Sequence, residues 1–221
     1  MPLDNFSPKQ PLNHSEEKML LNSVEFLASM QKRRSVRRFS DKPVSIDIIK
    51  NCINAAGSAP SGANKQPWHF AVISDPEMKQ QIRQQAELIE RDFYQKTAPE
   101  EWLQALKPLG TNEYKQFLET APYLIVVFMK RYGINPDGGR VRYYYPLESV
   151  GLATGFLLTA LHHAGLGTLT YTPAKMKFLN TLLNRPGSER PYMIVVAGHP
   201  AENVTFPEIT KKTLNEIASF F

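Results

Sequence analysis

Residues 123–129 read Tyr-Leu-Ile-Val-Val-Phe-Met (YLIVVFM) and form one of the longest apolar runs of the chain. Successive side chains of a β-strand point to opposite faces, so a strand that is apolar at every position is covered on both faces. The run has the length of a strand and is far short of the ~20 apolar residues that cross a bilayer. We therefore predict a central strand here, with other elements packed on both of its faces.

Helices and further strands are predicted on either side of this run. The β-branched and apolar clusters at residues 69–74, 169–172 and 192–197 predict strands. Helices are expected from Ser15, with an apolar stripe at Leu20, Val24, Leu27 and Met30; from Ser45 to Gly57; from Pro76, after the cap residue Asp75; and from Tyr143 to Ala164, before Gly165. Long helices with few strands indicate an α+β or α/β sandwich. Residues 1–14 are expected to form an extended arm, and residues 15–221 a single domain.

Composition and charge narrow the class of protein. The chain has 221 residues, enough for one good-sized domain, with 26 basic and 21 acidic residues and a net charge of +5. Acidic residues are interspersed with the basic ones, which argues against a nucleic-acid-binding surface. Cys52 is the one cysteine, so neither an internal disulfide nor a cysteine-based metal site is expected. The first residues have no apolar core of the kind found in signal peptides, and we expect a cytoplasmic protein that makes no membrane contact.

Residues 33–38, with the sequence RRSVRR, place four arginines directly after the first expected helix. Guanidinium groups bind phosphate oxygens in a two-pronged manner, so the segment is typical of a phosphate site. Cations at a helix C-terminus are also favoured by the helix dipole. A solvated charge cluster is therefore the alternative interpretation.

Two other segments are typical of chain that approaches a flat ligand. Residues 59–68 (APSGANKQPW) combine proline, glycine and small residues in a loop whose backbone can come close to a ligand. Residues 170–173 (TYTP) end an expected strand, where the proline would turn the chain and present the preceding hydroxyl. Taken alone, these segments are better interpreted as a plain loop and an ordinary strand end.

The pattern changes at about residues 89–115, where charges, aromatics and prolines mix with weak helical periodicity. Such segments are often lids over a site. Glu90 and Tyr94 are four residues apart and are expected on one helical face. With Lys115 they offer a carboxylate, a phenol and an ammonium, which complement the zwitterion of an amino acid. A solvated helical face is the alternative for the same residues.

Together, the segments RRSVRRFSDKPV, APSGANKQPW and TYTP resemble the iodotyrosine deiodinase branch of the FMN-dependent nitroreductase superfamily, in the same order and at similar spacing. The resemblance covers nearly the whole chain. It implies a nitroreductase-like α/β/α sandwich with a central, mostly antiparallel sheet. It also implies a domain-swapped homodimer that binds FMN at its interface, with the N-terminal arm and the residues after Pro207 wrapped on the partner.

The resemblance assigns roles to particular residues. Matches to the cofactor-binding positions are Arg33, Arg34, Ser35, Arg37, Pro60, Ser61, Thr170, Tyr171, Thr172 and Lys211. Matches to the substrate-binding positions are Ala63, through its backbone N–H, and Glu90, Tyr94 and Lys115. The Thr172 hydroxyl would bond flavin N5 and act in catalysis. Lys211 stands where the family usually has an arginine on the phosphate, which keeps the charge and loses the two-pronged geometry.

The activity implied is FMN-dependent reductive dehalogenation of halotyrosines such as 3-iodotyrosine, with NAD(P)H or a reductase as electron donor. One rival is a general NAD(P)H-dependent nitroreductase or flavin oxidoreductase acting on nitroaromatics or quinones. The other is a module that binds FMN or an amino acid without catalysis.

Overall fold

A computed structural model describes residues 13–221. Residues 1–12 of the expected N-terminal arm lie outside the described residues. The chain divides into two units, Met1–Arg33 and Arg34–Phe221, and each is described by itself.

The first unit contains one described helix, α1 (Glu16–Lys32), at the predicted place. The Ser15 side chain caps its first turn by accepting a hydrogen bond from the Lys18 N–H at 3.3 Å. None of the residues of α1 is buried, and the expected stripe, including Leu20 and Leu27, is exposed. The helix therefore has an exposed apolar face.

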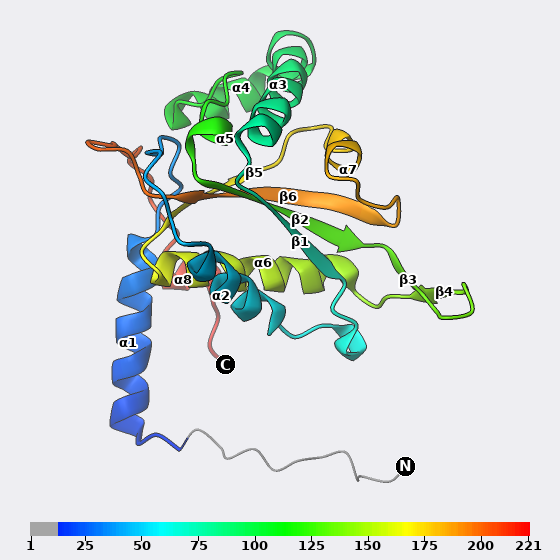
Figure 1. The fold of residues 1–221 in the computed structure, drawn as a ribbon. Coiled ribbons are helices and arrows are strands. Elements are labelled where there is room, and N and C mark those ends of the chain that lie inside the picture. Colours follow the sequence, from blue (N-terminus) through cyan, green and yellow to red (C-terminus); the bar gives the residue numbers. More distant parts are fainter. Residues whose placement is uncertain (1–12) are drawn as a thin grey trace. The chain divides into compact units, whose positions relative to one another are not determined.

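The second unit is built on a four-stranded sheet whose neighbouring strands are all antiparallel. Its order is β1 (Trp68–Ile73), β2 (Tyr123–Lys130), β6 (Glu189–Gly198) and β5 (Gly167–Tyr171). The prediction of a central strand is confirmed, because β2 pairs with β1 on one side and with β6 on the other. A hairpin of β3 (Tyr132–Ile134) and β4 (Arg140–Arg142) extends beyond the end of β2 (Figure 1).

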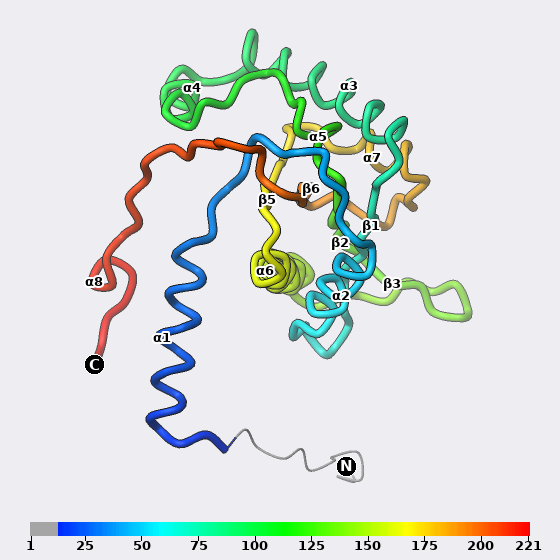
Figure 2. Tube along the Cα trace, turned by 60° about the vertical axis from the view of Figure 1, so that its left-hand side comes forward, coloured from blue at the N-terminus to red at the C-terminus, as the bar shows by residue number. Residues whose placement is uncertain are grey.

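Alternate residues of β2 face two separate cores, as its uninterrupted apolar sequence predicts. Leu124, Val126 and Phe128 pack under α3 (Pro76–Asp92), α5 (Phe117–Thr120) and α7 (Phe178–Leu182). Ile125 and Val127 pack against α2 (Ile46–Gly57) and α6 (Pro146–His163) on the opposite face. All five side chains are completely buried. Figures 1 and 2 show the helices on the two faces of the sheet, so the expected α+β fold and its α/β/α layering are confirmed.

Side-chain caps set the predicted helix starts. Asp75 accepts a hydrogen bond from the Met78 N–H at 2.8 Å, and Pro76 takes the first position of α3. Ser45 caps α2 by accepting from the Asp47 N–H at 3.3 Å. Gly57 ends α2 as predicted. It does not adopt the left-handed conformation that glycine often has at a helix end, and Ser58 after it is right-handed.

The start of α6 differs from the prediction. The helix begins at Pro146, and Tyr145 before it adopts a left-handed conformation with φ 49°. The expected start at Tyr143 was wrong because proline disfavours a helical conformation in the residue that precedes it, while it fits the first helical position. Gly165, with φ +83°, follows the end of the helix as expected. Neither α6 nor any other helix within residues 13–221 is long and apolar enough to cross a membrane.

Residues 35–40 extend the sheet beyond the outer edge of β5. Ser35 bridges Thr168 in parallel, and the Val36 N–H donates to the Thr168 carbonyl at 2.9 Å. Phe39 bridges Pro200 in the antiparallel sense. The backbone of the arginine segment from residue 35 onward is thus fixed to the sheet.

Candidate functional site

A cavity of about 230 Å³ lies between the lid segment and the end of β5. The lid consists of the end of α3, a π-helical turn (Phe93–Thr97) and α4 (Glu100–Leu106). The sequence-predicted residues that line the cavity are Arg37, Glu90, Tyr94, Lys115, Thr170, Tyr171 and Thr172. The structure therefore brings three of the four expected substrate residues, Glu90, Tyr94 and Lys115, together with residues 170–172 and one arginine of the RRSVRR segment.

Glu90 and Lys115 form a buried ion pair in this cavity. The Lys115 Nζ lies 3.1 Å from the Glu90 Oε2, and only 2% of Lys115 and 9% of Glu90 is exposed. The second carboxylate oxygen, Oε1, accepts a hydrogen bond of 2.9 Å from the Tyr171 hydroxyl. Both oxygens of Glu90 thus have a donor, which offsets the cost of burying its charge.

Tyr171 serves this pair as a hydrogen-bond donor. Burial, followed by the negative charge of Glu90 and the hydrogen bond to it, raises the pKa of the Tyr171 hydroxyl. The hydroxyl therefore stays protonated at neutral pH. The ring is held edge-on against Phe117, with 5.6 Å between ring centroids.

The Lys115 ammonium has three further neighbours. It donates a hydrogen bond to the Asn112 carbonyl, and its Nζ lies 5.3 Å from the ring centroid of Tyr94 and 5.7 Å from that of Tyr171. Such distances permit cation–π attraction. The Tyr94 hydroxyl lies 3.4 Å from Thr111 Oγ1, at the limit of a hydrogen bond.

Glu87, one helical turn before Glu90, fastens the backbone of Lys115 to α3. Its Oε1 accepts from the Lys115 N–H at 2.7 Å and from the Arg83 Nε at 2.7 Å. Burial acts to raise the pKa of the Glu87 carboxyl, but the hydrogen bonds from Arg83 and Lys115 and the charge of Arg83 lower it overall. An ionised Glu87 therefore holds Lys115 within reach of Glu90.

A second cavity, of about 550 Å³, adjoins the first. Ser35, Arg37 and Arg38 line it, together with residues 108–117 and 204–207 in part. Arg37 also lines the smaller cavity. Within residues 13–221 neither Arg37 nor Arg38 makes an ion pair, so their charge is available to an anion.

Three of the predicted phosphate-binding residues lie outside both cavities. Arg34 donates to the Pro207 carbonyl, and its guanidinium lies 5.1 Å from the centroid of the Phe206 ring, so it anchors the C-terminal segment. Lys211 is exposed, and neither cavity includes it. Arg33 belongs to the first unit, where its N–H caps α1 by donating to Met30.

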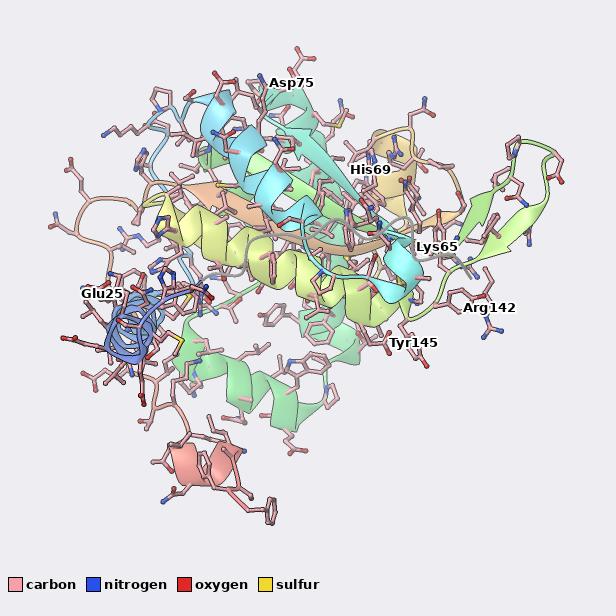
Figure 3. The ribbon with its side chains drawn as sticks, turned by 90° about the horizontal axis from the view of Figure 1, so that it is seen from below. Glu25, Lys65, His69, Asp75, Arg142 and Tyr145 are labelled. Atoms are coloured by element: carbon pink, nitrogen blue, oxygen red, sulfur yellow. The ribbon has the colours of Figure 1, made fainter. Side chains whose placement is uncertain are left out.

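The predicted loop residues Pro60, Ser61 and Ala63 lie on the other helical layer of the sheet and line neither cavity. Gly62 explains the tight course of the loop, because a Cβ at this position would lie 2.6 Å from the Tyr144 carbonyl oxygen. Ala63 has φ 49°, a strained conformation for a residue with a side chain. Figure 3 shows Lys65, at the end of this loop, near the start of α6 that Tyr145 marks.

Comparison with known proteins gives matches over most of the chain. Residues 30–199 match the family described as Nitroreductase family. The chain is 48% identical over 207 residues to iodotyrosine deiodinase of Haliscomenobacter hydrossis, across 94% of this chain and 93% of that protein.

The chain belongs to the nitroreductase family, in its iodotyrosine deiodinase branch. Human iodotyrosine deiodinase 1 is 40% identical over 211 residues, which span 94% of this chain and 73% of that protein. Among solved structures, oxidized iodotyrosine deiodinase bound to FMN and 3-iodo-L-tyrosine superposes with a TM-score of 0.73 at 32% identity, covering 86% of this chain and 97% of that one.

For this deiodinase-branch chain, sequence reasoning missed the residues that support the lid pair. Glu87, Arg83 and Asn112 have no local signal beyond the polar side of a helix or loop. The i,i+4 spacing of Arg83 and Glu87 was available, since such pairs neighbour each other on a helix. The hydroxyl of Tyr171 reaches Glu90 across 81 residues, a contact that only the fold reveals.

We expect Tyr171→Phe to lower the free energy of unfolding by about 1.5–3 kcal/mol, the range for a hydrogen bond to a charged group. Urea unfolding at fixed protein concentration measures this. Tyr123→Phe is the matched control: its hydroxyl donates to the neutral Val44 carbonyl at 3.0 Å, so the loss should be about 0.5–1.5 kcal/mol.

The raised pKa of Tyr171 also predicts how the stability of the protein depends on pH. Because the native pKa of Tyr171 lies above the unfolded value of about 10, its contribution is complete below pH 10 and is lost as the pH rises further. The wild-type protein should therefore lose stability with rising alkaline pH more steeply than Tyr171→Phe. Parallel curves would show that Tyr171 titrates as in the unfolded chain.

Proposed function

We propose that this protein catalyses the FMN-dependent reductive dehalogenation of halotyrosines, giving tyrosine and halide. The buried pair of Glu90 and Lys115, facing a cavity lined by Thr172, carries the proposal. A general nitroreductase has no need for two opposite charges held together beside its site, whereas an amino acid substrate offers the complementary pair.

The residues of the larger cavity suit the phosphate end of FMN. Ser35, Arg37 and Arg38 place a hydroxyl and two guanidinium groups without carboxylate partners around a space of about 550 Å³. Guanidinium groups bind phosphate with high geometric specificity. The smaller cavity continues from Arg37 toward Thr170 and Thr172, where the flavin ring would lie. When bound, FMN would supply the electrons for the reaction.

The lid pair would recognise the substrate by exchange of partners. The α-ammonium of a halotyrosine has the same charge as Lys115, so it can pair with Glu90. The α-carboxylate has the same charge as Glu90, so it can pair with Lys115. No charge is then left buried alone. Tyr171 and Glu87 hold the two residues in place while this occurs. This arrangement fixes the backbone end of the substrate and thereby positions its ring.

The aromatic residues of the lid would exclude water. Phe93 contacts Trp102 edge-on with 5.1 Å between centroids, and both line the cavity. In the reaction the carbon–halogen bond breaks, the ring carbon gains a hydrogen, and halide leaves after an electron pair and a proton are supplied. The Thr172 hydroxyl, exposed in the cavity, is the donor assigned to flavin N5.

We further propose a homodimer that exchanges its ends and completes each site with the loop of Pro60, Ser61 and Ala63 from the partner. Leu152 and Phe156 support this, because they are 49% and 43% exposed at i,i+4 spacing on α6, on the same layer as that loop. The C-terminal segment after Pro207 also exposes apolar side chains, among them Leu214, Ile217 and Phe220. The cytoplasm is the expected compartment, in keeping with the single, buried thiol of Cys52.

Anaerobic turnover of the FMN-loaded, dithionite-reduced protein tests the activity. We expect rapid flavin reoxidation by 3-iodotyrosine with release of tyrosine and iodide, and much slower reoxidation by iodophenol, which lacks the amino acid group. Glu90→Gln should raise KM for iodotyrosine by about tenfold to a hundredfold, the worth of a charge-assisted hydrogen bond. Rates with iodophenol should be unchanged by this substitution.

The control is the double variant Glu90→Gln with Lys115→Gln, which leaves no single charge buried and so separates lost binding from lost stability. Efficient reoxidation by 4-nitrophenol without reaction of iodotyrosine would reject dehalogenation in favour of the general nitroreductase.

Thr172→Ala should change the balance of activities. Without the donor to N5, nitro reduction should rise relative to deiodination by roughly three- to tenfold, the worth of one hydrogen bond. The ratio of the two rates on the same preparation measures this. An equal fall in both rates would contradict the role assigned to Thr172.

Leu152→Arg combined with Phe156→Arg should yield monomers that retain little FMN, because charge on an apolar interface opposes association. Light scattering gives the mass, and flavin absorbance the occupancy. Leu88→Arg is the control, since Leu88 is 56% exposed on α3, in the opposite layer. A monomeric wild type, or monomeric variants that hold FMN normally, would rule out the shared site.

A further inference from the structure

Left-handed backbone conformations cluster in two segments that contact each other. Within residues 13–221, six residues other than glycine have a positive φ, and the two outside these segments are asparagines, which tolerate it best. The other four are Ala63, Asn64 and Gln66 in the loop of residues 59–68, with φ between 47° and 52°, and Tyr145 before α6, with φ 49°. Strained residues of this kind persist only where their surroundings fix them, and they collect at functional sites. The cluster therefore points to a function that the loop and the start of α6 share.

The strained turn leaves one backbone donor free. In the described part of the chain the Ala63 N–H has no acceptor, whereas the N–H groups of residue 62 and residues 64–66 are occupied. The last three donate to the Ser61 carbonyl at 2.9 Å, the Gly62 carbonyl at 3.1 Å and the Ser61 Oγ at 2.9 Å, respectively. Ala63 is also exposed, so its N–H is accessible to a ligand.

Ser149 joins this turn to the start of α6. Only 3% of Ser149 is exposed. Its hydroxyl donates to the Tyr145 carbonyl at 2.7 Å, and its Oγ accepts from the Gly62 N–H at a long distance of 3.4 Å. Gly62 itself is closely packed, because a Cβ there would lie 2.6 Å from the Tyr144 carbonyl oxygen. One buried hydroxyl therefore holds both the residue before Ala63 and the strained residue before α6.

We propose that Ser149 is a positioning residue of the dehalogenation site. By holding Gly62 and Tyr145, it fixes the Ala63 N–H where this group donates to the ring oxygen of a halotyrosine bound by the partner subunit. The inference rests on the proposed function and on the shared site. It assigns a task to a buried residue that need not touch the substrate.

A single N–H donor at the ring oxygen favours the ionised ring. A phenolate accepts a stronger, charge-assisted hydrogen bond than a neutral phenol does. Such a donor has to be held within about 0.5 Å of its productive position, which requires support from a second layer of residues. The amino acid end of the substrate is assigned to Glu90 and Lys115 in the opposite layer. Loss of the Ser149 hydroxyl should therefore weaken recognition of the ring oxygen and leave recognition of the zwitterion unchanged.

Titration of the FMN-loaded, oxidised protein with 3-fluorotyrosine and 3-fluorophenylalanine tests this. The two probes share the amino acid group and the fluorine and differ only in the ring hydroxyl, and the oxidised flavin supplies no electrons for turnover. Flavin fluorescence reports binding. Ser149→Ala should weaken binding of 3-fluorotyrosine by about tenfold or more, the worth of a hydrogen bond to a charged group, and leave that of 3-fluorophenylalanine unchanged. The ultraviolet absorbance of the bound phenolate should fall in the same variant.

Thr154→Val is the matched control. Thr154 is also 3% exposed on α6, and its hydroxyl donates to the Val150 carbonyl at 2.7 Å, four residues earlier, as that of Ser149 does to Tyr145. This hydroxyl bonds α6 rather than the loop, so both probes should bind as they do to the wild type. Ser149→Cys, which keeps a weak donor and acceptor, should restore part of the loss. Gly62→Ala displaces the same turn from the loop side and should reproduce the selective loss.

Equal weakening of both probes by Ser149→Ala would show a purely structural role and overturn the proposal, as would unchanged binding of 3-fluorotyrosine. A wild-type protein that binds neither probe and releases no tyrosine from 3-iodotyrosine would reject the proposed function itself. A wild type that deiodinates and prefers 3-fluorotyrosine, together with a Ser149→Ala variant that keeps the full preference, would reject the role of Ser149 alone.

Discussion

The rest of the structure depends on the burial of β2 on both faces. Because residues 123–129 are apolar throughout, β2 has to be covered on both faces, and its alternating side chains divide the second unit into two cores. One core supports α3, which carries Glu90 and leads into the lid. The other supports α2 and α6, which carry the loop of residues 59–68. The sheet thus separates the residues that would hold the substrate from those that would complete a partner's cofactor site.

Within the lid layer, the pair of Glu90 and Lys115 is costly and its surroundings reflect that cost. A buried ion pair is weak evidence for stability, since desolvation of both charges offsets most of their attraction. Here the Tyr171 hydroxyl donates a second hydrogen bond to Glu90. The Lys115 ammonium also donates to the Asn112 carbonyl and lies near the Tyr94 ring. A simple apolar contact could replace this ion pair. Its many supporting contacts are therefore best explained by recognition of a ligand that carries one positive and one negative charge.

Sequence patterns predicted the elements well where one physical signal dominated. The uninterrupted apolar run gave β2, and the caps Ser15, Ser45 and Asp75 gave three helix starts. The predicted start of α6 at Tyr143 was wrong. The prediction followed the apolar content of the segment, although proline disfavours a helical conformation in the residue before it. The prediction that Glu90, Tyr94 and Lys115 lie together came from the family resemblance, because helical spacing relates only Glu90 and Tyr94. The contacts of Tyr171, Glu87 and Arg34 depend on tertiary placement, which local sequence does not encode.

The division of the site between two layers has a thermodynamic consequence. If the loop of Pro60 and Ser61 serves a partner's cofactor, a ligand that binds only the dimer stabilises the dimer by mass action. The exposed residues Leu152 and Phe156 would then be covered more completely when cofactor is abundant. Apolar surface that is tolerable in the assembled protein is a liability in the free chain. Cofactor supply would in this way control assembly as well as activity, because both depend on the same two faces of the sheet.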